Sequence, residues 1–174
     1  LFTGTVKNIL KFGSKNNHKP SGLFQSSNTE ICQESEYGMF VTVFYILVDT
    51  ASNIITYSSA GHNDQILVRK KNLEIVKLQT HGKPFGISDS ADYTEETILY
   101  EKGDKLFLFT DGLVESLGGE NMDIDIGFSE LSGLIISNID EGSENLLNVM
   151  RNRIRDLYPD TDLLDDLTVL IITL

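Results

Sequence analysis

The hydrophobic residues change their spacing along the chain, and that spacing predicts where helices and strands lie. Over residues 1–12 they recur roughly on one helical face, and residues 21–33 show a weaker helical pattern. From Met39 onwards, short β-branched and aromatic runs alternate with turn residues, which is the pattern of strands. These runs predict strands near 39–48, 54–60, 64–70, 73–78, 95–100 and 105–110.

After the strand at 105–110 the pattern changes again. Residues 118–127, "GGENMDIDIG", predict an acidic, solvated loop. Two helices should follow, with Ser143 as the N-cap of the second. Their apolar positions are Phe128, Leu131, Leu134, Ile135 and Ile139 for the first, and Leu146, Leu147, Met150, Ile154 and Leu157 for the second. A strand over 167–174 ends the chain, so the order of elements predicts an α+β layered fold with a mostly antiparallel sheet, in one domain over residues 1–174.

Charge and cysteine content narrow the classes of function. The 174 residues carry a formal net charge of −12, which argues against binding to nucleic acid or to an anionic membrane, because both need clustered Lys and Arg. The longest apolar runs are far shorter than the roughly 20 residues of a membrane span. Cys32 is the single cysteine, which excludes a disulfide framework and fits a reducing compartment, so we expect a cytoplasmic protein.

Candidate chemistry lies at the ends of two apolar strands. In "LFTDGLVES" the run that ends at Phe109 is followed by Asp111 and Gly112, which could simply turn a hairpin. In "LLDDLTVLIITL" the pair Asp165 and Asp166 comes directly before the last strand, where such residues are usually solvated. If the two strands are neighbours, however, Asp111 and Asp165 could converge at one edge of the core.

Two converging carboxylates would need a compensating charge. At a separation of about 4 Å and an effective dielectric constant near 20, they repel each other by about 4 kcal/mol. Neither Asp111 nor Asp165 has a Lys or Arg beside it in the sequence, so a hard divalent cation such as magnesium or manganese is the natural partner. Gly112 would allow the backbone to approach such a site closely.

Other motifs carry less weight. Residues 121–132 place Asn121, Asp123 and Asp125 at alternate positions, as a calcium loop does, but Ile126 and Ser132 stand where that loop needs Gly and Glu. The three histidines lack the spacing of a zinc site. His62, which follows a strand, is expected to be a hydrogen-bonded turn residue.

Six motifs, in order, resemble one family. They are "GMFVTVFY", "ITYSSAGHND", "GKPFGI", "LYEKGDKLFLFTDGLVES", "IGFSEL" and "LDDLTVLII". Together they resemble the metal-dependent serine/threonine phosphatases of the PPM class (type 2C), in the bacterial branch of sporulation protein E and the RsbU-type phosphatases. The resemblance covers the chain from about residue 1 to its end.

The resemblance implies a β-sandwich flanked by helices, with two manganese or magnesium ions between the sheets. It makes Asp111 and Asp165 metal ligands and catalytic residues, and it places Asp166 beside a ligand. With Gly112, these residues form the predicted metal site. The family's Ala-Gly-His turn matches Gly61 and His62, for which we expect a structural role.

The family also carries ligands in N-terminal strands that this sequence does not match. We therefore expect the chain to begin just after those ligands and, by itself, to be weakly active or inactive. Missing strands would also leave exposed strand edges, which favour a homodimer.

Two functions remain open at this stage. The first is hydrolysis of phosphoserine or phosphothreonine on a regulatory protein, which by family analogy could be an anti-sigma-factor antagonist. In this reaction, two metals would bind the phosphoryl oxygens and activate a water for in-line attack. The alternative is a truncated or pseudophosphatase module that binds a regulatory partner without catalysis.

Overall fold

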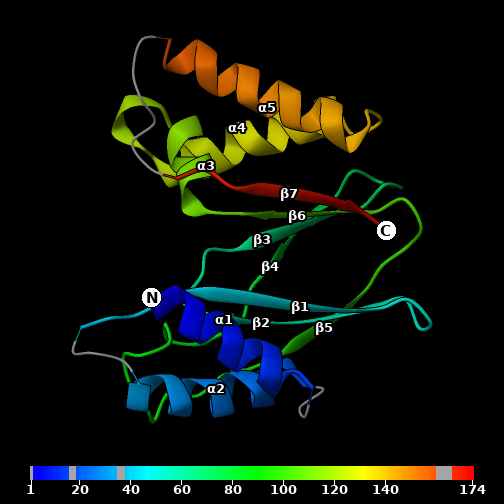
Figure 1. The fold of residues 1–174 in the computed structure, drawn as a ribbon. Helices are drawn as coiled ribbons and strands as arrows, with labels where there is room; N and C mark the ends of the chain where they lie inside the picture. Colours follow the sequence, from blue (N-terminus) through cyan, green and yellow to red (C-terminus); the bar gives the residue numbers. More distant parts are fainter. Residues whose placement is uncertain (1, 16–18, 35–37, 160–165) are drawn as a thin grey trace. The chain divides into compact units, whose positions relative to one another are not determined.

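The computed structural model describes residues 2–15, 19–34, 38–159 and 166–174 (Figure 1). These residues form two compact units, and the chain passes between them more than once. Unit 1 comprises Leu1–Asp64 and Leu78–Tyr100, and unit 2 comprises Gln65–Lys77 and Glu101–Leu174. Mixed helices and antiparallel strands confirm the α+β fold class.

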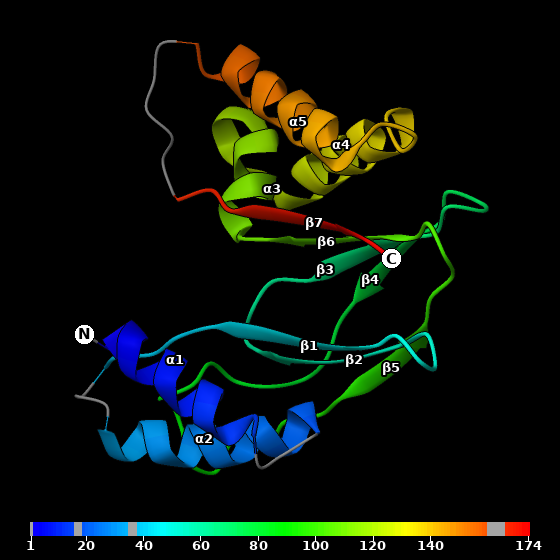
Figure 2. The ribbon, with the colours of Figure 1, turned by 45° about the vertical axis from the view of Figure 1, so that its right-hand side comes forward.

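Unit 1 is a three-stranded sheet with two helices. The sheet has the order β1-β2-β5, from β1 (Val43–Asp49), β2 (Ile54–Ala60) and β5 (Glu96–Leu99), and both pairs are antiparallel. The helices α1 (Phe2–Gly13) and α2 (Pro20–Glu34) lie together on one face of this sheet (Figures 1 and 2). Leu23, Phe24 and Ile31 of α2 are fully buried, which confirms the weak helical pattern of 21–33 as an amphipathic helix.

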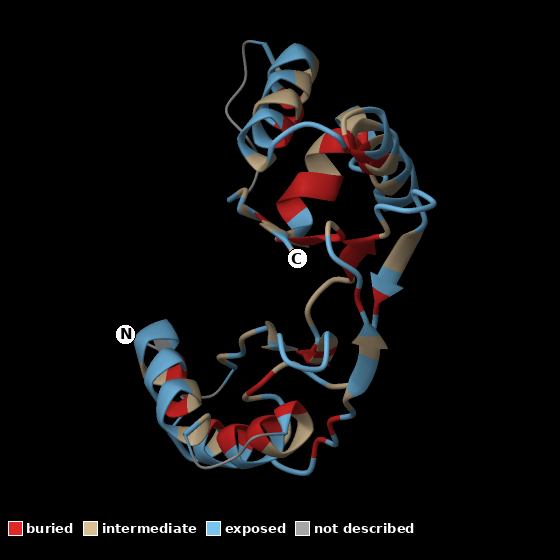
Figure 3. Cartoon of the chain, turned by 90° about the vertical axis from the view of Figure 1, so that its right-hand side faces the viewer, coloured by how far each residue is buried: buried red, intermediate tan, exposed pale blue. Residues whose placement is uncertain are grey.

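Unit 2 is built on the second sheet, of order β4-β3-β6-β7. Its strands are β3 (Gln65–Val68), β4 (Ile75–Leu78), β6 (Lys105–Phe109) and β7 (Val169–Thr173). The helices α3 (Asp111–Leu117), α4 (Ile124–Ser137) and α5 (Ser143–Leu157) cover one face of that sheet, and a short 3-10 helix, η1 (Gly119–Asn121), joins α3 to α4 (Figure 2). Figure 3 shows α3 as largely buried, whereas much of the surface of α4 and α5 is exposed.

Two local predictions in unit 2 need correction. The residues after Asp111 do not form only an acidic loop, because α3, η1 and the first turn of α4 occupy most of that stretch. Asp123 is the N-cap of α4, and its Oδ1 accepts hydrogen bonds from the backbone N–H groups of Asp125 and Ile126. Ser143 is the first residue of α5 rather than its N-cap, which is Gly142.

The first predicted strand also begins later than expected. Strand β1 starts at Val43, because Val41 instead forms an isolated bridge to Phe85, with hydrogen bonds in both directions. The other predicted strands agree with the structure to within about two residues at each end.

A glycine contact fixes the position of α3. Gly127 of α4 is buried, and a Cβ atom there would overlap with the carbonyl oxygen of Val114 in α3. The motif "IGFSEL" therefore has a packing reason, since only glycine lets the two helix backbones approach this closely. Because α3 begins with Asp111, this contact also helps to position the candidate site.

Candidate metal centre

The candidate centre begins with two neighbouring strands of unit 2. Strands β6 and β7 pair antiparallel, with Phe109 opposite Val169. The end of β6 therefore lies beside the start of β7, which confirms that the two strands are neighbours. Asp111 follows β6 and Asp166 precedes β7, so their backbones lie at the same end of the strand pair.

Asp111 is the first residue of α3 and is exposed to solvent. Its Oδ1 accepts a 3.1 Å hydrogen bond from the backbone N–H of Gly112, which is itself buried. Among the residues that the structure describes, no ion pair involves Asp111. The carboxylate is thus held locally by one backbone group and is open to a ligand on the solvent side.

Thr110 joins this strand end to the residues before β7. Its backbone N–H donates to the carbonyl oxygen of Thr168 at 3.1 Å, and its Oγ1 accepts from the N–H of Thr168 at 3.0 Å. The same hydroxyl donates to the carbonyl oxygen of Asp166 at 3.1 Å. Through Thr110, the structure brings Asp111 and the backbone of Asp166 to one end of the strand pair.

The remaining predicted ligand cannot be placed in the same way. Asp165 lies outside the described residues. Over the described ranges, no group of three or more His, Cys, Asp and Glu side chains is close enough to hold a metal ion. Asp111 and Asp166 fit a hard divalent cation in ligand type, since both offer carboxylate oxygens, but they are too few for a complete site.

Three residues at or near this strand end were not singled out from the sequence. Gln65, the first residue of β3, is buried and bonds both backbone groups of Phe109: its Oε1 accepts from the N–H at 2.7 Å, and its Nε2 donates to the carbonyl oxygen at 3.2 Å. Thr110 holds the other side of the strand. Glu115, half-buried, lies one helical turn after Asp111 in α3, so the helix carries two carboxylates at i and i+4. A helix prediction directly after the "TDG" motif would have pointed to Glu115, but the hydrogen bonds of Gln65 and Thr110 have no sequence signal.

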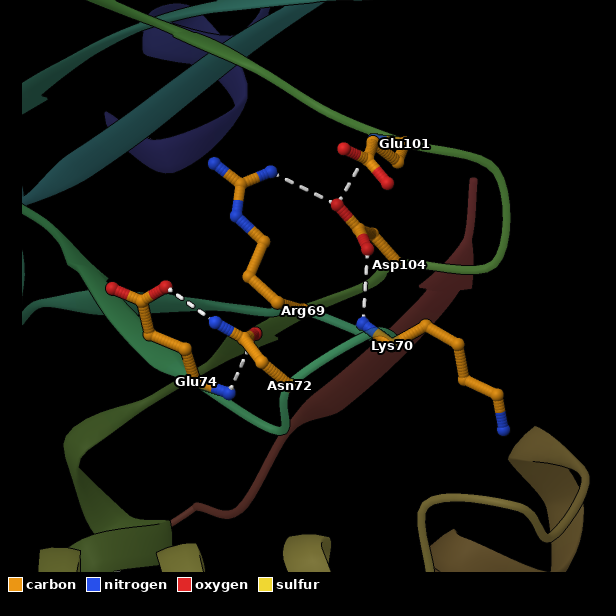
Figure 4. Close-up of polar contacts among 6 residues, drawn as sticks. All are labelled: Arg69, Lys70, Asn72, Glu74, Glu101 and Asp104. Carbon is orange, nitrogen blue, oxygen red and sulfur yellow. Dashed lines mark hydrogen bonds and ion pairs between the residues drawn. The ribbon is translucent and has the colours of Figure 1, made fainter.

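The opposite end of β6 is fixed by a buried carboxylate. Asp104 accepts hydrogen bonds from the backbone N–H groups of Lys70 and Glu101, and it pairs with Arg69 at 2.9 Å (Figure 4). Burial by itself raises the pKa of Asp104, but the hydrogen bonds from Glu101, Lys70 and Arg69, together with the Arg69 charge, outweigh it and hold the pKa below its usual value. Asp104 joins the turn after β3 to the turn before β6, so it is a structural anchor of the sheet.

The Gly61-His62 turn lies in unit 1, and His62 is a hydrogen-bonded turn residue, as expected. Gly61 has a φ of +66°, and a Cβ there would lie 2.5 Å from the ring of Pro84, so no other residue fits this position without strain. The Nδ1 of His62 lies 3.0 Å from the hydroxyl of Thr42, and its backbone N–H donates to Ser59. These contacts hold His62 in a turn.

The structure also argues against a calcium-binding loop at residues 121–132. Most of this stretch is helical, because η1 ends at Asn121 and α4 begins at Ile124. Asp123 already uses its Oδ1 to cap α4.

Among the described residues, no helix is both long and apolar enough to cross a membrane.

Comparison with known proteins places the chain in a family. The family model described as Stage II sporulation protein E (SpoIIE) matches residues 1–174. Phosphoserine phosphatase RsbU of Bacillus subtilis (strain 168) is 33% identical over 96 residues, which are 55% of this chain and 29% of RsbU. The match to this curated relative thus spans less than a third of its length.

Solved structures share the fold. The SiaA-PP2C domain of Pseudomonas aeruginosa is 13% identical with a TM-score of 0.80, over 99% of this chain and 68% of that one. The manganese-presoaked phosphatase domain of SpoIIE from Bacillus subtilis is 13% identical with a TM-score of 0.65, over 97% of this chain and 72% of that one. With a family model that spans its whole length and a fold shared with these phosphatase domains, the chain belongs to the Stage II sporulation protein E family.

Proposed function

We propose that this protein hydrolyses phosphoserine or phosphothreonine on a regulatory protein, with the help of manganese or magnesium. The observation that carries the proposal is the position of Asp111, exposed at the end of β6 and beside the residues that lead into β7. The relationship to the phosphoserine phosphatase RsbU supports the choice of reaction.

In this proposal Asp111 and Asp165 are the catalytic metal ligands, and Gly112 and Asp166 are the other residues of this chain at the site. Carboxylates that approach each other at a strand end repel, so they favour a bound divalent cation. When bound, such ions would polarise the phosphoryl group and lower the pKa of a water molecule. The chain's own part is to hold the ligand oxygens at the surface, where a phosphorylated side chain of another protein can reach them.

The charge of the chain bears on how substrate is recruited. With a net charge of −12, the protein surface repels phosphate, so the metal site has to supply the local positive charge. We propose that the substrate is a phosphorylated signalling protein, such as an anti-sigma-factor antagonist. We also propose that the reaction takes place in the cytoplasm. The two units are proposed to work as one phosphatase domain over residues 1–174. Self-association into a homodimer remains a prediction.

A second candidate is a pseudophosphatase module that binds a regulatory partner without catalysis. It is favoured by the small number of carboxylates that gather at the candidate centre among the described residues. One pair of measurements, turnover and metal binding, separates this candidate from the phosphatase.

The test is the substitution Asp111→Asn, with Asp125→Asn as its matched control. Both residues are exposed aspartates in the first turn of a helix in unit 2, but Asp125 lies in α4, outside the candidate centre. Hydrolysis of p-nitrophenyl phosphate and of a phosphoserine peptide, which we expect to be slow for this chain by itself, should require manganese or magnesium and stop with EDTA. Loss of a residue that only orients a ligand costs 10–100-fold, so loss of the Asp111 ligand should lower turnover by at least about 100-fold, whereas Asp125→Asn should leave it unchanged.

Metal binding is measured separately by thermal unfolding. Manganese at 100-fold above its dissociation constant should stabilise the protein by about 2.7 kcal/mol, and Asp111→Asn should remove most of that gain. Manganese-dependent turnover that survives Asp111→Asn would refute the proposed site. Binding without turnover would favour the pseudophosphatase.

A further inference from the structure

The start of α4 exposes large apolar side chains more densely than any other described part of the chain. Among the described residues, twelve large apolar side chains are exposed, and three of them, Met122, Ile124 and Ile126, fall within five residues. Their exposed fractions are 43%, 59% and 59%. A single apolar side chain on a surface needs no explanation, but several together, bordered by polar residues, are typical of an interaction site. These three residues are called the Met122 group below.

The backbone that carries the Met122 group is fixed at both ends. Before the group, the carbonyl oxygen of Gly119 accepts hydrogen bonds from the hydroxyl of Tyr158 and from the N–H of Met122, each at 2.9 Å. After the group, the backbone of Gly127 packs directly against the carbonyl of Val114 in α3. The three side chains are therefore held in solvent by a backbone that is anchored within unit 2.

The charge around the group is mainly of one sign. From Leu106 to Met150 the chain has no Lys, Arg or His and carries nine Asp and Glu residues. Glu120 is exposed beside the group, and no ion pair among the described residues involves it. Exposed apolar side chains with negative charge beside them are complementary to an apolar surface that is flanked by Lys or Arg.

Two other occupants match this charge poorly. A second copy of the chain has the same net charge of −12, and the groove between its α1 and α2 is lined by Glu30 and Glu34, which would repel the start of α4. An anionic lipid surface would repel it for the same reason.

We infer that the Met122 group is a docking site for another protein, one that presents an apolar surface flanked by Lys or Arg. The apolar side chains supply affinity because they leave water on binding, and the acidic residues select a basic partner. The inference goes beyond the proposed function and does not depend on it, since neither the group nor its test involves a metal ion or turnover.

The experiment uses the whole protein and a labelled synthetic helical peptide of about 15 residues, with Leu on one face and Lys on the other. Two control peptides of equal length carry Ser in place of Leu or Glu in place of Lys. Fluorescence anisotropy gives each dissociation constant. The test variant combines Met122→Ser, Ile124→Ser and Ile126→Ser. The matched variant combines Ile136→Ser and Leu147→Ser, which remove exposed apolar side chains elsewhere on α4 and α5.

We expect the Leu-Lys peptide to bind at least about 10-fold more tightly than either control peptide. The triple variant should lose that margin, and the matched variant should keep it. Glu120→Lys leaves the apolar side chains in place and should weaken binding about threefold at low salt, with a smaller effect at high salt because salt screens exposed charges.

The inference is wrong if the triple variant has the thermal stability of the unmodified protein and still binds the Leu-Lys peptide equally well. If the triple variant does not fold, Glu120→Lys decides instead, and unchanged binding at low salt overturns the inference. Light scattering and binding to neutral phosphatidylcholine vesicles test the other occupants. A dimer, or vesicle binding, that only the triple variant loses would assign the group to a second copy or to a lipid surface and would likewise overturn the inference.

Discussion

The cores of the two units are built from different kinds of side chain. The core of unit 1 is aromatic: Phe24 lies 4.9 Å from Phe85 and 5.6 Å from Tyr93 between ring centroids, and all three pairs among these rings are edge-to-face. The core of unit 2 is mainly aliphatic, with Leu, Ile and Val side chains of the helices packed against the sheet.

The aromatic core of unit 1 holds an irregular segment in place, whereas the aliphatic core of unit 2 packs against regular strands. Phe85 and Tyr93 belong to the long segment 79–95, which has no helix or regular strand, so large rings and the buried amide of Asn28 hold it against α2. In unit 2, regular strands are fixed at their ends, by Asp104 at one end of β6 and by Gln65 and Thr110 at the other. Unit 2, whose strand ends are fixed in this way, carries Asp111, which fits the need of the proposed metal site for accurately placed ligands.

Gly127→Ala should give the largest effect, and it tests how tightly the helices of unit 2 are packed. The new Cβ would overlap with the carbonyl of Val114, so α3 and α4 would have to separate. We expect a loss of about 3 kcal/mol in the free energy of unfolding, measured by urea denaturation followed by circular dichroism. The control Gly133→Ala in the same helix meets no atom within 4 Å and should stabilise the protein by about 0.5–1 kcal/mol. Equal effects for the two variants would show that the close approach of α3 and α4 is not needed.

Asn28→Ala tests the corresponding support in unit 1. The Asn28 amide donates to the carbonyl of Ser88 at 2.7 Å and accepts from the N–H of Gly86 at 3.1 Å. Removal of the side chain leaves both backbone groups without this partner, which should cost about 2 kcal/mol by the same urea measurement. Asn145→Ala, which removes an exposed amide from α5, should change stability by less than about 0.5 kcal/mol. A cost for Asn28→Ala as small as the control's would mean that the aromatic rings alone hold the segment 79–95.

Asp104→Asn should give the smallest effect of the three at neutral pH, about 1–2 kcal/mol, because asparagine keeps one acceptor oxygen and Arg69 can still reach water. The folded-state pKa of Asp104 is below its usual value, so its stabilisation is present above about pH 4 and is lost as the pH falls through the folded pKa. The variant should therefore lose less stability than the unmodified protein between about pH 4 and pH 2.

The control for this acid dependence is Asp49→Asn in unit 1. The pKa of Asp49 is also lowered, first by the hydroxyl of Ser52 and then by the backbone N–H groups of Ala51 and Ser52, but its carboxylate lies in solvent. Its substitution should change the acid profile less than that of Asp104. An acid profile that Asp104→Asn leaves unaltered would assign the acid sensitivity of unit 2 to other carboxylates.

Much of the fold was determined by the sequence alone. The period of hydrophobic residues predicted both N-terminal helices and the two long C-terminal helices, because each helix buries one face and so repeats its apolar positions. Short apolar runs, most of them β-branched or aromatic and set apart by turn residues, predicted all seven strands. The position of Asp111 at a strand end and its resemblance to a phosphatase motif were equally readable. Each of these features depends on residues that are close together in the chain.

Only the tertiary structure decided the features that depend on distant residues. Helix α3 is too short for a clear period, and it forms because Leu113, Val114 and Leu117 are buried against the rest of unit 2. From the sequence, the convergence of Asp111 and Asp165 required β6 and β7 to be neighbours, and only the structure shows that these two strands pair. The hydrogen bonds of Thr110 to residues 166 and 168 join positions more than 50 residues apart, and no local pattern encodes such contacts. The sequence could name the carboxylates, but the backbone that holds Asp111 beside Asp166 is a product of packing.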